Sequence, residues 1–487
     1  MGLIDILSSI AKFLPDVKVA EKPPSGKERF IWTGIALLLF FLMYHITVFG
    51  ISISASAGTD FLQTITASRL GSLITTGIGP IVLASIFLQL FVGAGIIKLN
   101  MHDKKDKKKF HEAQKVLAII LALVEATIYA TTALSGYVVP GLPQPLTTIL
   151  IVVQIALGSV IMIYLDEIVT KYGIGSGISL FIAAGVSQAI IGGLFGLIFN
   201  ENTGMVAILT SGGAESIARA LLVLLPLIAT VIVFMVCVFA EGVKVEIPIA
   251  FERVRGMAPK LPLKFFYVSN IPVIFAAALI LNIQIFAGAA LPKHMDADGN
   301  VNIAAVQDDF ISKYIGFVNP EGRLSDGFLY FITPVNAGGT DVVNFWQNYL
   351  LAAETPINKI PEWVHAVTYI LFLAFISVLF GIFWTETSNM DAKSVTNQLM
   401  QSGIQIPGFR RDPRMIEQIL GKYIFPLTVL GSFSVGLLAG LADLTGALGT
   451  GTGILLTVGI LYRMYEQIEQ MNMFEMYPGL GNLIGKD

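Results

Sequence analysis

Ten stretches of about 20 mostly apolar residues recur along the chain, and each can cross the hydrocarbon core of a bilayer as a helix. Only 13% of the residues are charged, roughly half the share of a soluble domain. This composition excludes a soluble globular enzyme, a disordered regulator and a nucleic-acid-binding module. We therefore expect an all-α polytopic membrane protein with spans at residues 30–49, 74–97, 116–135, 146–165, 174–198, 220–240, 265–290, 364–384, 423–442 and 446–465.

Lysine and arginine indicate the orientation of these spans. With the N-terminus in the cytoplasm and the spans alternating, 25 of the 31 Lys and Arg residues lie in the cytoplasm. The loop after the second span holds seven of them, including a lysine run at 104–109. The positive-inside rule then predicts a multi-pass protein of the cell membrane with both termini cytoplasmic.

The spans divide the chain into two halves of five. Two prolines at a five-span offset, in Ile78-Gly79-Pro80-Ile81-Val82 and Ile271-Pro272-Val273-Ile274, suggest a repeat. So do two G-x-G-x-G-I motifs, which begin at Gly173 and Gly449. An odd number of spans per half inverts the second half, the architecture of many transport proteins, and places a site at the interface between the halves. The alternative is that these glycines permit close helix packing and the prolines kink their helices.

The expected domains follow from this division. Apolar residues recur at helical spacing from Leu3 to Leu14, which predicts a short helix on the membrane surface. The domains are an N-terminal cytoplasmic segment at 1–29, a first half at 30–199, an external hinge at 200–219, a second half at 220–465 with a long external segment at 291–363, and a cytoplasmic tail at 466–487.

Chemistry-bearing motifs are scarce in the expected spans. Glu125 is the one ionisable residue well inside a span, and we interpret it as a helix-packing residue rather than a coupling site. Gly177-Ile178-Ser179 resembles an intramembrane serine motif, but that chemistry needs a histidine base, and only His45 and His365 lie near spans. No HExxH, Cys/His cluster or phosphate loop occurs. We expect no enzymatic activity, no cofactor and no metal.

External residues 59–76, before the second span, carry a partly apolar face but are too short and polar to cross a bilayer. They suit a half-helix that dips back from the external side, which is tolerated only within a protein-lined cavity. An ordinary external loop is the alternative.

Five long motifs closely resemble SecY, the family of channel subunits of the general protein translocase, in its archaeal and eukaryote-like branch. The resemblance extends from about Trp32 to Gln467 and is weakest in the external segment 291–364. The motifs are QTITASRLGSLITTGIGPIVLASIFLQLFVG (63–93), IYLDEIVTKYGIGSGISLFIAAGVSQ (163–188), VEIPIA with YVSNIPVIFAAAL (245–279), FGIFWTET (380–387) and GALGTGTGILLTVGILYRMYEQ (446–467).

The resemblance implies a channel that conducts unfolded secretory polypeptides through an hourglass pore. It also implies lateral release of transmembrane segments into the bilayer between helices 2–3 and 7–8. An aliphatic ring at the constriction would resist ion flow yet yield around a passing chain. By motif, the ring is Ile78, Val82, Ile174, Ile178, Ile274 and Leu456.

The same resemblance implies three further sites. The lateral gate would carry Asn270, with Gln89 and Ser85. The docking surface for a ribosome or motor ATPase would carry Arg253, Arg255, Arg410 and Arg411. An external plug would consist of Asp60, Phe61, Leu62, Gln63, Thr64, Ile65, Thr66, Ala67, Ser68, Arg69 and Leu70.

Partners are also implied by the resemblance. They are a small single-span clamp subunit of the SecE or gamma type, a further small subunit of the beta type, polypeptides bearing signal sequences, and membrane lipid. An inverted-repeat secondary solute transporter is the main alternative. It predicts polar or charged residues converging at midmembrane, whereas the residues that converge here are aliphatic.

Overall fold

The structure is a computed structural model. It describes residues 3–476 apart from 19–23, 53–65, 98, 100, 102, 140, 142, 144, 201–203, 212–215, 249, 252–259, 295–300, 320–323, 336–344, 402–403 and 406–412.

A helix accounts for each of the ten predicted spans, which confirms the predicted fold class. Seven described segments are long and apolar enough to cross a membrane, and α4 is a shorter apolar helix. The ten helices are α2 (Gly26–His45), α4 (Gly79–Gly93), α5 (Lys104–Thr131), α6 (Leu146–Tyr172), α7 (Gly177–Phe199), α10 (Leu225–Glu241), α11 (Ile271–Ala290), α15 (Glu362–Thr387), α17 (Pro413–Asp443) and α18 (Gly451–Met476).

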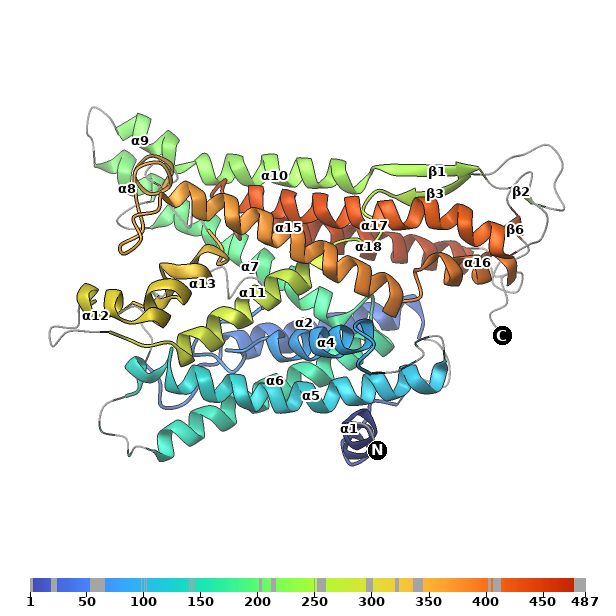
Figure 1. The fold of residues 1–487 in the computed structure, drawn as a ribbon, viewed down its shortest axis with the longest axis horizontal. Coiled ribbons are helices and arrows are strands. Elements are labelled where there is room, and N and C mark those ends of the chain that lie inside the picture. Colours follow the sequence, from blue (N-terminus) through green and yellow to red (C-terminus); the bar gives the residue numbers. More distant parts are fainter. Residues whose placement is uncertain are drawn as a thin grey trace.

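The two ends of the helical bundle carry different connections (Figure 1). One end holds α8 (Met205–Thr210), α9 (Ser216–Val223), α12 (Ile303–Asp308) and α13 (Gly327–Phe331). The other end holds α16 (Ala392–Gln401) and the strands β1 (Lys244–Pro248), β2 (Ala250–Phe251), β3 (Lys260–Lys264) and β6 (Ile404–Gln405). The predicted external segments thus lie opposite the predicted cytoplasmic loops, as alternating spans require.

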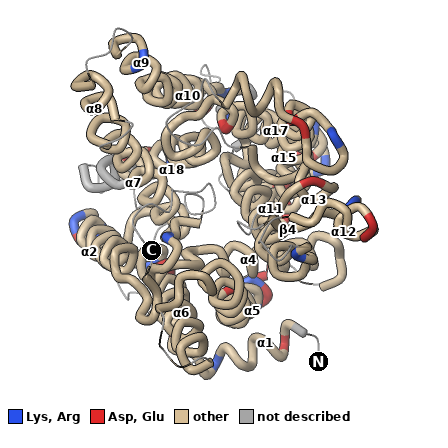
Figure 2. The backbone as a smooth tube through the Cα atoms, turned by 90° about the vertical axis from the view of Figure 1, so that its left-hand side faces the viewer, with Lys and Arg blue, Asp and Glu red and all other residues tan. Residues whose placement is uncertain are grey.

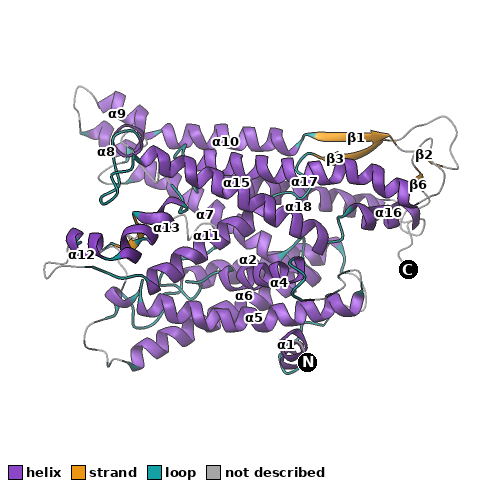
Figure 3. Ribbon diagram, in the orientation of Figure 1, coloured by secondary structure: helices purple, strands orange, loops and turns teal. Residues whose placement is uncertain are grey.

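Strands are few and short, and they lie at the two ends of the bundle (Figure 3). β1 pairs antiparallel with β3 within the loop between α10 and α11. β2 pairs antiparallel with β6, which joins that loop to the one between α15 and α17. At the opposite end, β4 (Phe317–Val318) pairs with β5 (Leu324–Ser325).

The lysine run at 104–109 belongs to a helix, so its assignment to a loop was wrong. α5 begins at Lys104, and the Asp103 side chain caps it by accepting a hydrogen bond from the Lys105 backbone. Lysine is a good helix former, and aspartate is a favoured N-cap residue. The positive charge therefore does not interrupt α5.

The N-terminal segment forms a helix, α1 (Leu3–Ala11), as its apolar spacing predicted. Its buried residues Ile4 and Leu7 pack with Phe110, Ala113 and Val116 of α5. Part of its apolar face therefore contacts the protein, whereas Ile6 and Ile10 remain exposed.

The two repeat prolines begin helices and do not kink them. Pro80 and Pro272 lie in the first turns of α4 and α11, where a missing backbone N–H costs nothing. The residues that precede these helices have nearly identical backbone angles, φ −89° and ψ −1° at Ile78, and φ −90° and ψ 0° at Asn270. This shared local geometry agrees with a repeat between the halves.

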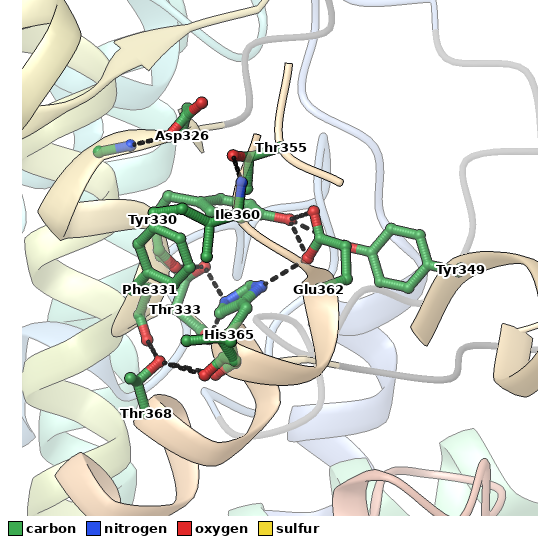
Figure 4. A network of polar contacts seen from close by, with 12 residues as sticks. Asp326, Tyr330, Phe331, Thr333, Tyr349, Thr355, Ile360, Glu362, His365 and Thr368 are labelled. Atoms are coloured by element: carbon green, nitrogen blue, oxygen red, sulfur yellow. Dashed lines mark hydrogen bonds and ion pairs between the residues drawn. The ribbon is translucent and has the colours of Figure 1, made fainter. Parts of the chain in front are cut away.

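A polar network ties α13 to the first turns of α15 (Figure 4). The Tyr330 hydroxyl lies 2.9 Å from both carboxylate oxygens of Glu362 and 2.8 Å from the Tyr349 hydroxyl. His365 contacts Glu362 through Nδ1 at 3.3 Å and the Thr333 carbonyl through Nε2 at 3.0 Å. His365 is thus engaged in the first turn of α15, and among the described residues it does not pair with Ser179.

Asp326 holds together a second part of the predicted external segment, 291–363. Its carboxylate accepts hydrogen bonds from the backbones of Gly327, Ile357 and Asn358 and from the Asn358 side chain. Burial alone would raise the pKa of Asp326, but these hydrogen bonds outweigh burial and hold the pKa below its usual value.

Acid should loosen this part of the external segment. Because the folded-state pKa of Asp326 is lowered, its stabilisation is fully present above about pH 4 and is lost as the pH falls through the folded-state value. Hydrogen exchange of the Ile357 and Asn358 amides at decreasing pH measures the effect. Asp326→Asn should exchange faster at neutral pH and lose most of the pH dependence; an unchanged acid response in that variant would contradict the assignment.

Candidate pore and lateral gate

Four helices surround the middle of the molecule when it is viewed from the end that holds α8, α9, α12 and α13 (Figure 2). They are α4, α7, α11 and α18, the helices that carry the proline and glycine motifs. Outside them, α2, α5 and α6 lie on one side and α10, α15 and α17 on the other. The helices that carry or directly follow the predicted ring residues therefore meet in the middle of the molecule.

Five of the six predicted ring residues share the central apolar cluster. Four of them are buried, and Ile178 is partly exposed and packs against the cluster. They come from all four central helices and are Ile78, Val82, Ile178, Ile274 and Leu456. Ile178 also packs against a neighbouring cluster on α4 and α5. The structure therefore brings these aliphatic side chains together from both halves.

Ile174 has a different environment from the other five. It is buried, and its backbone N–H donates a 3.0 Å hydrogen bond to the Thr33 hydroxyl of α2. It precedes α7, so its position is set by the loop between α6 and α7.

The described end of the predicted plug, Thr66–Leu70, forms turns and not a half-helix. Ala67 is fully buried and belongs to the central cluster with Ile78. The Ile78 N–H donates a 2.9 Å hydrogen bond to the Thr66 carbonyl. The predicted plug segment therefore contacts the predicted ring through a backbone hydrogen bond. Asp60–Ile65 lie outside the described residues.

Gly77 makes this contact possible. Its φ of +55° belongs to the left-handed region, and a Cβ there would lie 2.0 Å from the Thr66 carbonyl oxygen. The preceding residue, Thr76, is held against α6, because its hydroxyl forms a short hydrogen bond with that of Ser159. Residues 66–78 are thus fixed between the ring and α6.

The halves meet where α4 faces α15. A Cβ on Gly93 of α4 would lie 2.4 Å from the Phe383 ring of α15. From the same turns of α15, Phe380 and Trp384 contact Phe275 of α11 edge-on, with ring centroids 5.8 and 5.7 Å apart. This interface joins the helices between which lateral release is expected.

The predicted gate amides do not bridge that interface in the described part of the chain. Asn270 is fully buried and donates a 2.9 Å hydrogen bond to the Leu455 carbonyl of α18, within its own half. Gln89 donates to Ser85 on the same helix at 3.1 Å. The amide oxygens of Gln89 and Asn270 are buried without a hydrogen-bond partner among the described residues.

Glu125 is buried beside the start of α4. One carboxylate oxygen would lie 3.0 Å from a Cβ on Gly79. This position fits the packing role predicted for Glu125 and places a carboxyl group at a helix N-terminus, where negative charge is favoured.

The predicted docking arginines, Arg253, Arg255, Arg410 and Arg411, lie outside the described residues. The pairing of β2 with β6 nevertheless holds together the two loops that carry them. In the part of the chain that the structure describes, no group of three His, Cys, Asp or Glu residues could hold a metal.

Sequence reasoning missed several residues of this site. Gly93 and Phe383 both lie in motifs that carry the family resemblance, but nothing in the sequence pairs them. Asp443 and Tyr369 form a buried hydrogen bond of 2.8 Å between α17 and α15. Asp443 directly follows the ninth apolar stretch, and a carboxylate at the end of a span is the signal that could have identified it.

Comparisons with known proteins agree with this geometry. The SecY family model matches residues 72–465. The protein translocase subunit SecY of Methanocaldococcus jannaschii is 41% identical over 488 residues, which cover 99% of each chain. Two solved structures each cover 98% of this chain and 99% of their own at 39% identity. One, with a TM-score of 0.74, concerns a SecY plug domain that stabilises the closed translocation channel and maintains a membrane seal. The other, with a TM-score of 0.73, is Sec61 in the canine ribosome-channel complex from the endoplasmic reticulum.

Proposed function

The chain belongs to the SecY family, and on that premise we propose how its residues serve a protein-conducting channel. It is the channel-forming subunit of a protein translocase, which passes unfolded secretory polypeptides across the membrane and releases transmembrane segments sideways into the bilayer. A secondary solute transporter is not favoured, because such a protein gathers polar or charged groups at midmembrane.

One observation carries the assignment of the pore. Aliphatic side chains from α4, α7, α11 and α18 meet in one cluster with the end of the plug segment. An apolar constriction dewets and so blocks the passage of ions, and it offers no specific hydrogen bonds to a passing chain. Ile78, Val82, Ile174, Ile178, Ile274 and Leu456 form the ring in this proposal, and residues 60–70 form the plug that seals it from outside.

The gate lies between α4 and α5 on one side and α11 and α15 on the other. The Gly93–Phe383 contact supports it, because a glycine lets the two helices approach closely without a hydrogen bond that would hold them shut. In this proposal Ser85, Gln89 and Asn270 supply polar groups that a signal sequence meets as it enters. The unpartnered amide oxygens of Gln89 and Asn270 are available for that role.

The partners proposed here act at the two ends and along the sides of the bundle. Arg253, Arg255, Arg410 and Arg411 contact a ribosome or motor ATPase, and arginines suit the phosphates of ribosomal RNA. The paired loops that carry them support a single docking surface. A SecE- or gamma-type clamp subunit and a beta-type subunit complete the complex in the cell membrane, with both termini of this chain in the cytoplasm.

A photocrosslinking experiment tests the pore. A photoreactive residue at Ile178, in the complex reconstituted with its partner subunits, is presented with stalled nascent chains of increasing length that bear a signal sequence. The crosslink should move along the nascent chain as it lengthens. The matched control is Ile161 of α6, which is 44% exposed on the outside of the bundle and should give no moving crosslink. No crosslink at Ile178 in an intact complex would contradict the proposal.

A further inference from the structure

Two carboxylates bind the first turns of two pore helices in the same way. Asp166, near the end of α6, accepts a 2.8 Å hydrogen bond from the Ile178 N–H through Oδ1. Asp443, at the end of α17, accepts a 2.7 Å hydrogen bond from the Thr452 N–H through Oδ1. Ile178 and Thr452 are each the second residue of their helices, α7 and α18. Each aspartate therefore satisfies the same otherwise unpaired N–H group.

The glycine motifs let these carboxylates approach. A Cβ on Gly177 would lie 2.5 Å from the Asp166 Cα, and a Cβ on Gly451 would lie 2.0 Å from the Ala442 carbonyl carbon. Both glycines are the first residue of their helix. α7 begins at the third glycine of its G-x-G-x-G-I motif, whereas α18 begins at the second glycine of its motif. The feature that the two halves share is therefore the capped first turn of the helix and not the position of the motif.

The two caps act directly on the proposed ring. The N–H that Asp166 binds belongs to Ile178 itself. Thr452 lies four residues before Leu456, which places both on one face of α18. The cap in each half thus sets the position of the helix turn that carries, or leads into, a ring side chain.

The second cap is also bound to the gate. The Tyr369 hydroxyl of α15 donates a 2.8 Å hydrogen bond to Asp443 Oδ2, and the Thr452 hydroxyl donates to the same oxygen at 2.6 Å. All three side chains are buried. Because α15 also faces α4 at Phe383, one carboxylate joins a gate helix to a ring helix.

We propose that Asp166 and Asp443 are positioning residues that hold the ring helices α7 and α18 in the closed state, and that Tyr369 couples the second cap to the lateral gate. Movement of α15 away from α4 withdraws the Tyr369 hydroxyl from Asp443 and loosens the first turn of α18. Asp166 holds the first half without such a link. This inference rests on the proposed ring and names the residues that set its geometry.

Ion conductance of the reconstituted complex in planar bilayers tests the coupling. Tyr369→Phe removes one hydroxyl and should raise the open probability of the resting channel at least about tenfold, the factor expected for one lost hydrogen bond to a charged group. Asp443→Asn should have a similar effect. The open probability of the double variant, Tyr369→Phe with Asp443→Asn, should be close to that of either single variant, because both substitutions remove the same hydrogen bond. Tyr369→Phe combined with Asp166→Asn should instead be additive.

Asp326→Asn is the matched control, since it alters an aspartate that also accepts backbone hydrogen bonds but lies in the external segment. It should leave conductance unchanged. Ile178→Gly tests the ring itself. If Ile178→Gly leaks while Tyr369→Phe behaves like Asp326→Asn, the coupling is wrong and the ring stands. If Ile178→Gly does not leak, the ring is wrong and the coupling falls with it. If Asp443→Asn fails to fold, the conductance of Tyr369→Phe alone tests the coupling, because this variant retains the ring and the Asp443 cap.

Discussion

Ile78→Ser should make the resting channel leak ions. Ile78 is 1% exposed, lies at the start of α4 and belongs to the central apolar cluster. A hydroxyl buried there without a hydrogen-bond partner costs about 1–3 kcal/mol. A hydrated, open constriction removes that cost, so its population should rise by about 5- to 150-fold. Single-channel conductance of the reconstituted complex measures the change.

A control variant separates the seal from general loss of packing. Ile151 of α6 is as fully buried as Ile78, but it packs with Ala126, Leu134 and Ile155 in a cluster away from the four central helices. Ile151→Ser should lower thermal stability by a similar amount and leave the conductance low. Equal leak from both variants, or none from Ile78→Ser, would remove Ile78 from the ring.

The fold could be predicted from the sequence because lipid imposes a simple rule. A chain in a bilayer must satisfy its backbone hydrogen bonds locally, so a long apolar run becomes a helix. Element boundaries were less predictable. The α5 start at Lys104 shows that charged residues can continue a spanning helix beyond its apolar part. Likewise, Pro80 and Pro272 mark helix starts, because proline is tolerated in the first turn of a helix, where its missing N–H has no intrahelical partner.

The site was predictable only in part, because contacts between distant residues leave no spacing signal. The ring residues followed from motif resemblance, and five of them meet in one cluster. The hydrogen bond from Asn270 to Leu455 joins residues 185 apart in the chain, and the assignment of Asn270 to the gate interface did not anticipate it. The contact between Gly93 and Phe383 depends on how the halves close, which neither motif encodes alone.

The contact between the proposed plug and the proposed ring depends on Gly77, and this leads to the second large expected effect. Gly77→Ala should displace the plug segment from the ring and produce a leaking channel. The new Cβ would lie 2.0 Å from the Thr66 carbonyl oxygen, a backbone atom that cannot move aside without residues 66–68 moving with it. That shift would break the hydrogen bond from the Ile78 N–H to Thr66 and withdraw Ala67 from the central cluster.

Gly95 provides the control for Gly77. It also has a left-handed backbone, with φ of +69°, but a Cβ there would meet nothing within 4 Å. Gly95→Ala therefore carries only the conformational cost of that backbone, about 1–3 kcal/mol, and should leave the channel closed. Gly77→Ala adds the collision with Thr66, so its conductance should exceed that of Gly95→Ala at equal expression and folding. Equal conductance would mean that Thr66 yields without opening the pore, and the plug would then seal through residues other than 66–68.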